Sequence, residues 1–344
     1  MNGDFMAATL HDVARIAGVS IKTVSNVIND YPHIRSTTKQ RVLDAIAELD
    51  YQPNLSARSL RSGRTGVIGL AVPELSLSYF AELADAVIRS AERHGVTVLI
   101  EQTGGDRARE IELLTSPRRQ LTDGLIFSAL GMDSDDSEYL RVGYPLVLLG
   151  ERIFGGPTDH VTMRNVDAAR AATEHLIALG RRRIAVIGAH EGEVIGSAGL
   201  RLRGYREALE AAGIPFDPAL IGYTTLWHRS NGADAMRALL ASGVEFDAVF
   251  GLNDTLTLGA MRVLQEAGLR IPKDVAAIGF DDLDEAQYSL PTLTTIDPGR
   301  EEIAETAVRV LLERIASTDL ALPPREILAD FRIVERESTA PAAA

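Results

Sequence analysis

One side of a short helix near the amino terminus carries side chains that can form hydrogen bonds. Ser20 can cap this helix, and Val24, Val27 and Ile28 form a narrow apolar stripe along it. The stripe leaves a second face, made of Ile21, Lys22, Ser25, Asn26 and Asn29. Ammonium, amide and hydroxyl groups on such a face can donate hydrogen bonds to another molecule. This face is therefore free to bind a partner.

Two neighbouring helices must position that face. Thr9, with Asp12 three residues later, has the pattern of a helix start, and an apolar face follows at Leu10, Val13, Ala14 and Ala17. Gly18 ends this helix, so residues 17–20 form the turn of a helix-turn-helix, whose second helix enters the major groove of DNA. A third helix, capped by Ser36 or Thr37, runs through Val42, Ile46 and Leu49 and ends before Pro53. Spacing alone fits any small three-helix bundle equally well.

Charge favours the front of the chain as the part that meets nucleic acid. The 344 residues carry a net charge of −13, which opposes binding to a polyanion. Residues 1–65 nevertheless have a net charge of +2, and residues 54–65 hold three arginines and no acidic residue. The remaining chain, at −15, would repel DNA.

Several classes of protein are disfavoured by what the sequence lacks. With no cysteine, the chain has no disulfide, no thiolate nucleophile and no cysteine-ligated metal, which suits a reducing cytoplasm. No export signal or membrane-spanning apolar run is apparent, so we expect a cytoplasmic protein that does not enter a membrane. The catalytic patterns G-x-S-x-G, H-E-x-x-H, the P-loop and G-x-G-x-x-G are missing, and the seven histidines have no metal-ligand spacing. An enzyme, a metal site and a bound cofactor are therefore not expected.

Beyond residue 66, short apolar runs alternate with helical stretches. The runs are 67–72, 96–100, 125–127, 146–149, 184–187, 248–250 and 275–280, and the helical stretches are 80–94, 166–179, 202–212, 231–241 and 255–267. This alternation predicts an α/β fold of doubly wound parallel sheets, and the length favours two lobes. Because such sheets bind ligands at the carboxyl ends of their strands, two facing lobes would form a binding cleft.

Longer sequence runs resemble the lactose-repressor/galactose-repressor (LacI/GalR) family of transcription regulators. They are TLHDVARIAGVSIKTVSNVIN at 9–29, YQPNLSARSL at 51–60, RLRGY at 201–205, ND at 253–254, GFDD at 279–282 and LTTI at 293–296. The resemblance implies a helix-turn-helix head at 9–53, a hinge helix and linker at 54–65, and a periplasmic-binding-protein-like core at 66–338. Its N-lobe would span about 66–165 and 299–327, and its C-lobe about 166–298 and 328–338.

The same resemblance assigns residues that contact DNA. Ile21, Lys22 and Asn26 occupy base-reading positions, and Lys22 suits guanine while Asn26 suits adenine. Phosphates or nearby DNA would be contacted by Ser20, Thr23, Ser25, Asn29, His33 and Thr38. For His33, a surface histidine without a DNA contact is an equal alternative. In the hinge, Asn54 would contact DNA, and Ala57 and Leu60 would face the minor groove, with Leu60 inserted between base steps. A basic linker without ordered structure is the alternative there.

An effector site is implied in the cleft. Arg201, Asn253 and Asp281 match the family's polar ligand-binding positions, and Tyr79, Phe80 and Trp227 fall where side chains pack on the ligand. Glu151, Arg152 and Arg300 are added because 148–152 and 297–300 depart from the usual family pattern. The polar groups and the lone tryptophan favour a carbohydrate, and a nucleobase or nucleoside is the alternative. For Trp227 and Asp281, roles in core packing and in strand-end capping remain open.

The resemblance predicts a homodimer that binds a pseudo-palindromic operator, most plainly as a repressor. A small-molecule effector would act either as an inducer or as a corepressor. The tail at 338–344 lacks apolar heptads, which favours a dimer over a tail-assembled tetramer. A solute-binding protein with the same core is the competing class, but it would carry an export signal and no DNA-binding head.

Overall fold

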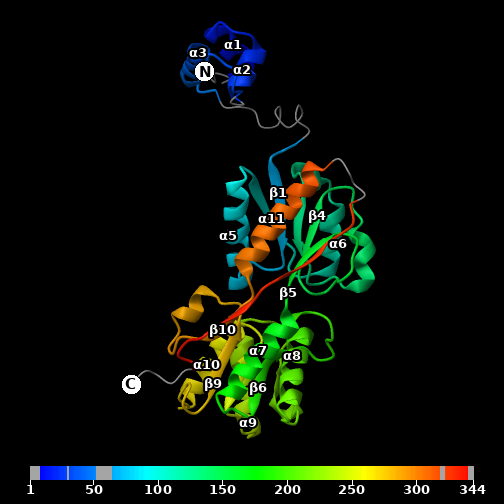
Figure 1. Cartoon of the computed structure of the whole chain (residues 1–344), viewed down its shortest axis with the longest axis vertical. Coiled ribbons are helices and arrows are strands. Elements are labelled where there is room, and N and C mark those ends of the chain that lie inside the picture. The colour runs from blue at the N-terminus through cyan, green and yellow to red at the C-terminus, as the bar shows by residue number, and fades with distance from the viewer. Residues whose placement is uncertain (1–7, 29–30, 52–63, 318–321, 340–344) are drawn as a thin grey trace, which may run out of the picture. The chain divides into compact units, whose positions relative to one another are not determined.

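The chain forms two units, residues 1–65 and 66–344, in a computed structural model that describes residues 8–28, 31–51, 64–317 and 322–339 (Figure 1). The first unit holds the three predicted helices, α1 (Leu10–Ala17), α2 (Ile21–Ile28) and α3 (Ser36–Glu48). Val13, Val24 and Val42, one from each helix, are fully buried in one shared hydrophobic core. The three-helix head is thus confirmed, with the turn between α1 and α2 at residues 18–20.

The predicted start and end of α1 are confirmed in detail. The Thr9 hydroxyl accepts a hydrogen bond from the Asp12 backbone N–H (3.3 Å), and the Asp12 carboxylate accepts one from the Thr9 N–H (3.1 Å). This reciprocal pair satisfies donors that the helix itself leaves unpaired. Gly18 ends the helix in the left-handed conformation, with φ 62°. Ser20 caps α2 by accepting from the Thr23 N–H at 3.1 Å.

The predicted cap of α3 is wrong. Neither Ser36 nor Thr37 is the cap, because the helix already begins at Ser36 and the capping position falls on Arg35. Arg35 has extended backbone angles and makes no side-chain capping bond. A serine inside the first turn cannot accept from the N–H groups that a capping side chain would reach, so α3 begins without such a bond.

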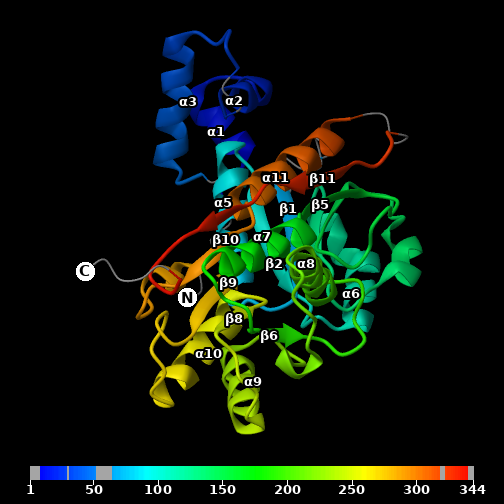
Figure 2. The ribbon, with the colours of Figure 1, turned by 60° about the horizontal axis from the view of Figure 1, so that its bottom comes forward.

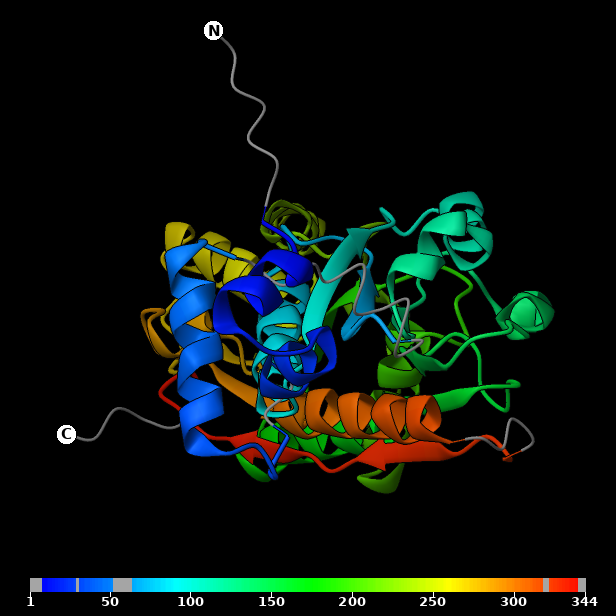
Figure 3. The ribbon, with the colours of Figure 1, turned by 90° about the horizontal axis from the view of Figure 1, so that it is seen from above.

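Two six-stranded sheets form the second unit, as the alternating pattern predicted. The N-lobe sheet has the order β11-β5-β4-β3-β1-β2 and is parallel throughout. Its strands are β1 (Val67–Val72), β2 (Thr97–Gln102), β3 (Leu125–Ser128), β4 (Leu146–Leu149), β5 (Asp159–Met163) and β11 (Glu326–Ala329). Its helices are α5 (Ser78–Arg93), α6 (Arg107–Thr115) and α11 (Arg300–Ala316), and α11 runs beside the segment that holds β11 (Figure 3).

The C-lobe sheet has the order β12-β10-β9-β8-β6-β7, with only β12 antiparallel. Its strands are β6 (Ile184–Ala189), β7 (Ile221–Tyr223), β8 (Ala248–Gly251), β9 (Ala276–Phe280), β10 (Thr294–Asp297) and β12 (Arg332–Val334). Its helices are α7 (Asn165–Ala178), α8 (Ser197–Ala211), α9 (Arg229–Ser242) and α10 (Asp254–Glu266). Helix α7 packs on α8, and α9 packs on α10 (Figure 2).

Burial on both faces explains why the strands are apolar runs. In β3, Ile126 belongs to one core cluster, whereas Leu125 and Phe127 belong to the cluster on the opposite face with Leu113 and Leu114 of α6. Successive strand residues point to opposite faces, so a sheet covered by helices on both sides needs apolar residues at every position. The predicted doubly wound α/β architecture is confirmed.

The chain passes between the lobes three times, after β5, after β10 and after β11. Strand β11 continues to Ala329, so the last passage lies two residues beyond the predicted boundary at 327. Among the described residues, no helix is both long and apolar enough to span a membrane.

Candidate functional site

The outer face of α2 carries the residues predicted to contact DNA. Lys22 and Ser20 are exposed, and Thr23, Ser25 and Asn26 are half-buried. Ile21 is also half-buried and packs against the head core, so only part of it faces outward. His33 is exposed beside the Tyr31 ring, and Thr38 is half-buried at the start of α3. Asn29, Asn54, Ala57 and Leu60 lie outside the described residues.

A cavity lies between the two lobes, at the carboxyl ends of strands from both sheets. All seven residues predicted to bind an effector line it, namely Tyr79, Phe80, Glu151, Arg201, Trp227, Asn253 and Asp281. Arg152 lines it as well, whereas Arg300 does not. Strand ends and the helices that follow them bring together residues that are up to 202 positions apart in the sequence.

Arg201, on α8, is the most tightly held of these side chains. Its Nε donates to the Asn165 side-chain oxygen at 2.7 Å, and Nη1 donates to the Leu252 carbonyl. The guanidinium lies 3.5 Å from the centre of the Phe280 ring and forms an ion pair with Asp281, with Nη2 to Oδ1 at 3.7 Å. Burial lowers the pKa of Arg201, and Asp281 opposes this effect. Such a fully anchored cation presents a fixed donor to the cavity.

Asp281 follows β9 and is 4% exposed. Burial raises its pKa to about 7, against the opposing charges of Arg201 and Arg300. Asp281 and Asp282 have φ values of 117° and 49°, backbone conformations that residues other than glycine rarely adopt. Strained backbone of this kind persists only where the surroundings impose it.

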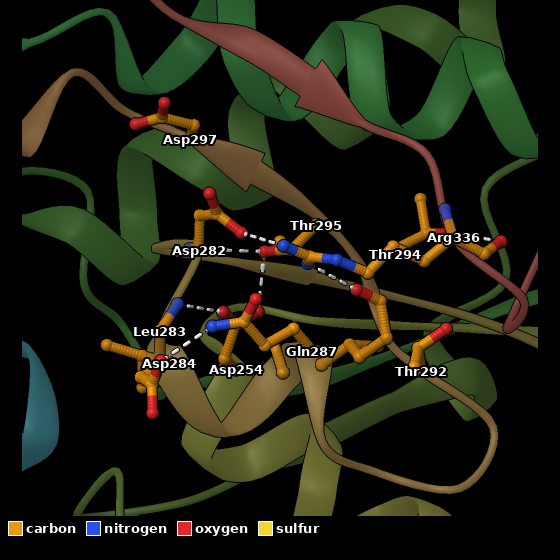
Figure 4. Close-up of polar contacts among 12 residues, drawn as sticks. Asp254, Asp282, Leu283, Asp284, Gln287, Thr292, Thr294, Thr295, Asp297 and Arg336 are labelled. Atoms are coloured by element: carbon orange, nitrogen blue, oxygen red, sulfur yellow. Dashed lines mark hydrogen bonds and ion pairs between the residues drawn. The ribbon is translucent and has the colours of Figure 1, made fainter.

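Three residues, Asp254, Arg336 and Arg300, form hydrogen bonds around this turn, and Figure 4 shows those of Asp254 and Arg336. The Asp254 carboxylate accepts from the Leu283 N–H at 2.9 Å and from the Thr295 hydroxyl at 2.6 Å. Arg336, near the end of the chain, donates to the Asp282 carboxylate at 2.6 Å. Arg300 donates to the Asp281 carbonyl at 2.7 Å. Arg300 therefore supports the turn from the N-lobe rather than lining the cavity.

Asn253 and Trp227 are both anchored by one polar atom. The Asn253 side-chain oxygen caps α10 by accepting from the Leu256 N–H (2.8 Å), and its amide nitrogen makes no hydrogen bond with another described residue. Trp227 donates its indole N–H to the Gly188 carbonyl at 2.8 Å. A side chain at Gly188 would place its Cβ 3.3 Å from that indole nitrogen and 2.4 Å from Leu256. The Arg201 guanidinium lies over this ring, 5.3 Å from its centre, so a sugar ring or a base would pack on the part of Trp227 that lines the cavity.

Glu151 and the two aromatic residues close the N-lobe side. The Glu151 carboxylate accepts from the Ser197 hydroxyl of the C-lobe at 2.7 Å and from the Thr162 hydroxyl at 3.3 Å. His160 donates from Nε2 to the Gly150 carbonyl at 2.6 Å and so fixes the backbone before Glu151. Tyr79 and Phe80, at the start of α5, meet edge to face at 5.2 Å. Burial raises the pKa of the Tyr79 hydroxyl, which keeps it neutral.

Other cavity residues were missed by the sequence analysis. They include Glu74, His190, Glu193, Ser197 and His228. His228 pairs with Glu74 across the lobes at 3.4 Å, and Arg152 pairs with Glu193 at 3.0 Å. These residues sit in loops or at helix starts, where no periodicity marks them.

Comparison with known proteins agrees with this architecture. Residues 9–54 match the family model described as bacterial regulatory proteins, lacI family, and residues 173–339 match the periplasmic binding protein-like domain. A solved putative transcriptional regulator of the LacI family from Sanguibacter keddieii is 55% identical, with a TM-score of 0.75 over 80% of this chain and 99% of that one.

Two solved structures extend the likeness to the head as well. The transcriptional regulator CelR–cellobiose complex is 32% identical, with a TM-score of 0.71, over 96% of this chain and 99% of that one. The lac repressor dimer bound to operator and an anti-inducer is 29% identical, with a TM-score of 0.83 and the same coverage. With identity above 30% over almost the whole of a relative, and with the head and the two-lobed core in one chain, this protein belongs to the LacI family of bacterial transcription regulators.

Proposed function

We propose that this regulator is a cytoplasmic repressor that binds a pseudo-palindromic operator as a homodimer and responds to a carbohydrate in the cavity between its lobes. The observation that supports the carbohydrate best is the composition of the cavity. Arg201, Asn253 and Asp281 offer a guanidinium, an amide and a carboxyl group on one side, and Trp227 offers a flat face. A sugar matches such a set, because its hydroxyl groups can bond to the polar side chains and the C–H face of its ring can pack on the tryptophan. The similarity to the CelR–cellobiose complex supports the same class.

The outer face of α2 is the proposed DNA contact. Lys22 and Asn26 would read base edges, with Ile21 making an apolar contact, and the remaining predicted residues of the head would bind phosphates. Lys22→Ala or Asn26→Ala should cost about 1–3 kcal/mol of discrimination at one base position. Binding to operators selected from a random pseudo-palindromic library measures this loss, and unaltered base preference in both variants would remove α2 from the proposal.

The hinge is proposed from the sequence alone. Leu60 would insert between two base steps at the operator centre, at a cost that flexible steps reduce. Leu60→Ala should then weaken binding to the selected operator while leaving ligand-induced stabilisation of the core unchanged.

Dimer formation is proposed from the lac repressor dimer and from a surface of the C-lobe. Tyr288 and Leu290, two residues apart, are 77% and 83% exposed. Large apolar side chains that are this exposed, at neighbouring positions of one loop, would be buried by a partner surface.

A thermal-shift screen against sugars, sugar phosphates and nucleobases tests the effector. A ligand at 100 times its dissociation constant stabilises the protein by about 2.7 kcal/mol. Stabilisation by a sugar supports the proposal, and Trp227→Ala should abolish it. Stabilisation by a nucleobase alone would favour the second candidate, for which Tyr79 and Phe80 supply the flat surface. Adding the bound compound to the operator complex then decides between induction and corepression.

A further inference from the structure

One corner of the cavity is built from Arg152 of the N-lobe with His190 and Glu193 of the C-lobe. A single oxygen of the Glu193 carboxylate, Oε2, lies 3.0 Å from Arg152 Nη2 and 2.9 Å from His190 Nδ1. The other oxygen accepts from the backbone N–H groups of Ala198 (3.2 Å) and Gly199 (3.3 Å) in the first turn of α8. One carboxylate therefore fixes both an arginine and a histidine against a helix end.

The corner is closely packed around that carboxylate. At Gly196, which has a φ of 111°, a Cβ would lie 2.6 Å from Glu193 Oε1 and 3.6 Å from the Arg152 guanidinium carbon. The His190 ring also lies 5.8 Å from the Trp227 ring, between centroids. A side chain at position 196 would therefore displace the Glu193 carboxylate, and the φ of 111° also favours glycine there.

The bonding pattern determines what the histidine can offer. Burial raises the pKa of Glu193, but the hydrogen bond from His190 and the charge of Arg152 outweigh it, so the pKa lies below its usual range. An ionised carboxylate only accepts hydrogen bonds, so His190 Nδ1 carries the proton. In the neutral ring Nε2 is then an acceptor.

Two atoms of this corner have no hydrogen-bond partner among the residues that the structure describes. His190 Nε2 and Arg152 Nε are both buried, and neither is bonded to any other described residue. Both residues line the cavity. The corner therefore holds one acceptor and one donor whose needs nothing in the described protein meets. Both atoms are shielded from solvent in this arrangement, so a ligand group reaches them only when the Arg152 and His190 side chains turn slightly toward the cavity.

We propose that this corner recognises one hydroxyl group of a neutral polyhydroxy effector. The hydroxyl donates to His190 Nε2 and accepts from Arg152 Nε–H. The inference rests on the proposed function and refines it, because it selects the carbohydrate over a nucleobase. Four carboxyl groups line the cavity, those of Glu74, Glu151, Glu193 and Asp281, against two arginines, Arg152 and Arg201, and this excess disfavours an anionic group. Glu151 and Asp281 would accept further donors, and a polyol supplies more of these than a base does.

The test combines changes in the ligand with changes in the protein. Binding of cellobiose, D-glucose and D-ribose, of each of their monodeoxy derivatives, and of guanine and hypoxanthine is measured by calorimetry on the full chain. For the sugar that binds, one deoxy derivative should bind about 10- to 100-fold more weakly, because it leaves both atoms unpaired. In His190→Phe that penalty should fall at least several-fold, and in Arg152→Lys it should fall as well.

A matched control separates this corner from the rest of the cavity. His228 also lines the cavity but faces Glu74, so His228→Phe should keep the full penalty for the same deoxy sugar. If, for every deoxy derivative, the loss of affinity relative to the parent sugar is the same in wild type and in His190→Phe, the inference is overturned. The proposed function is unaffected by that result. Binding of a nucleobase alone, or of none of these compounds by a chain that still binds its selected operator, also overturns the inference. If the wild-type chain binds no operator specifically, that result contradicts the proposed function itself.

A measurement without ligand tests the geometry directly. In nitrogen-15 spectra of the ring-labelled full chain near pH 7.5, with His190→Phe used for assignment, His190 should show a protonated Nδ1 and an unprotonated Nε2. A proton on Nε2 in the free protein would remove the acceptor and overturn the inference.

Discussion

At the scale of single residues, the cavity contains a carboxyl group, that of Asp281, whose pKa lies close to neutral pH. Burial of Asp281 favours the neutral form, and Arg201, with Nη2 3.7 Å from Oδ1, is too far away to cancel that effect. Near pH 7 the group can therefore accept or donate a hydrogen bond. An Asp281→Asn variant resembles the protonated form permanently.

The raised pKa of Asp281 predicts a pH dependence with a definite sign. Between the ordinary value of 3.8 and about 7, the folded state binds a proton that the unfolded state has lost, so stability falls as pH rises. The free energy of unfolding of wild type, minus that of Asp281→Asn, should decrease from pH 4 to pH 7 and level off above it. Urea unfolding across this range measures the difference.

The control for this measurement is Asp274, whose pKa is lowered to about 2 by hydrogen bonds from Arg270. That residue is ionised in both states above about pH 5, so the difference between wild type and Asp274→Asn should be flat from pH 5 to 8. A flat profile for Asp281→Asn too would contradict the assignment of the buried carboxyl.

The cavity residues show what could and could not be predicted from the sequence. Three of the residues predicted to bind an effector, Arg201, Asn253 and Asp281, could be placed at the cavity because they lie in the motifs RLRGY, ND and GFDD at strand ends and helix starts. His190 and Glu193 lie in a loop between Gly188 and Gly196, where neither periodicity nor spacing reports which side chains turn inward. Their positions depend on a hydrogen bond to each other and, for Glu193, on one to Arg152 of the N-lobe, which only the folded arrangement supplies.

At the scale of elements, the head offers a direct test of helix capping. Thr9→Ala removes the capping box of α1 and should destabilise the head by about 1 kcal/mol. Ser36→Ala should have little effect, because Ser36 lies inside α3 and caps nothing. Amide hydrogen exchange of α1 and α3 in the full chain measures both. Equal losses in the two variants would show that the difference in capping is not what stabilises these helices.

Strand β5 was missed in the sequence because its residues, DHVTM, do not form an apolar run. It is buried nonetheless, since Arg314 and Arg325 donate to the fully buried Asp159 carboxylate at 2.6–3.1 Å. These hydrogen bonds offset the cost of burying a charge and tie β5 to α11 and to the segment before β11. Polar strands of this kind are recognised only when their partners, here more than 150 residues away, are known.

Removing that tie should destabilise the N-lobe. Asp159→Asn leaves Arg314 largely buried without its partner charge, and we expect a loss of about 2–4 kcal/mol in the free energy of unfolding. Asp330→Asn is the control, because its ion pair with Arg164 is exposed and contributes little. Urea unfolding measures the free energy of unfolding of both variants, and Asp159→Asn should be clearly less stable than Asp330→Asn. Similar stabilities would argue against a stabilising role for the buried hydrogen bonds of Asp159.

At the scale of the whole molecule, the proposed dimer predicts that the surface at Tyr288 and Leu290 is sensitive to an added charge. Leu290→Asp would place a charge in an apolar interface and should weaken dimerisation by at least about 30-fold. Operator affinity should fall with it, because two half-sites are then bound by separate chains. Sedimentation equilibrium measures the first effect and operator titration the second. Leu121→Asp, at another exposed leucine, should leave both unchanged.

The fold class and the two lobes were predictable because strand and helix periods alternate along the chain, as in β1, α5 and β2. The short strands β7 and β12 escaped notice because three residues carry no period. They join their sheets through hydrogen bonds to distant strands rather than through local preference.

Both sheets are completed by the last strands of the chain, β11 and β12, and Ser338 is hydrogen-bonded to Thr294 and Ala277. The head, in contrast, has all of its described core residues by position 51. During synthesis from the amino terminus, the head can thus fold on the ribosome long before either lobe has its full set of strands. A truncated chain that ends before β11 would contain the three-helix head but would lack the last strand of each sheet. Removal of such unfinished chains by the cell therefore matters for whether operator binding depends on the effector.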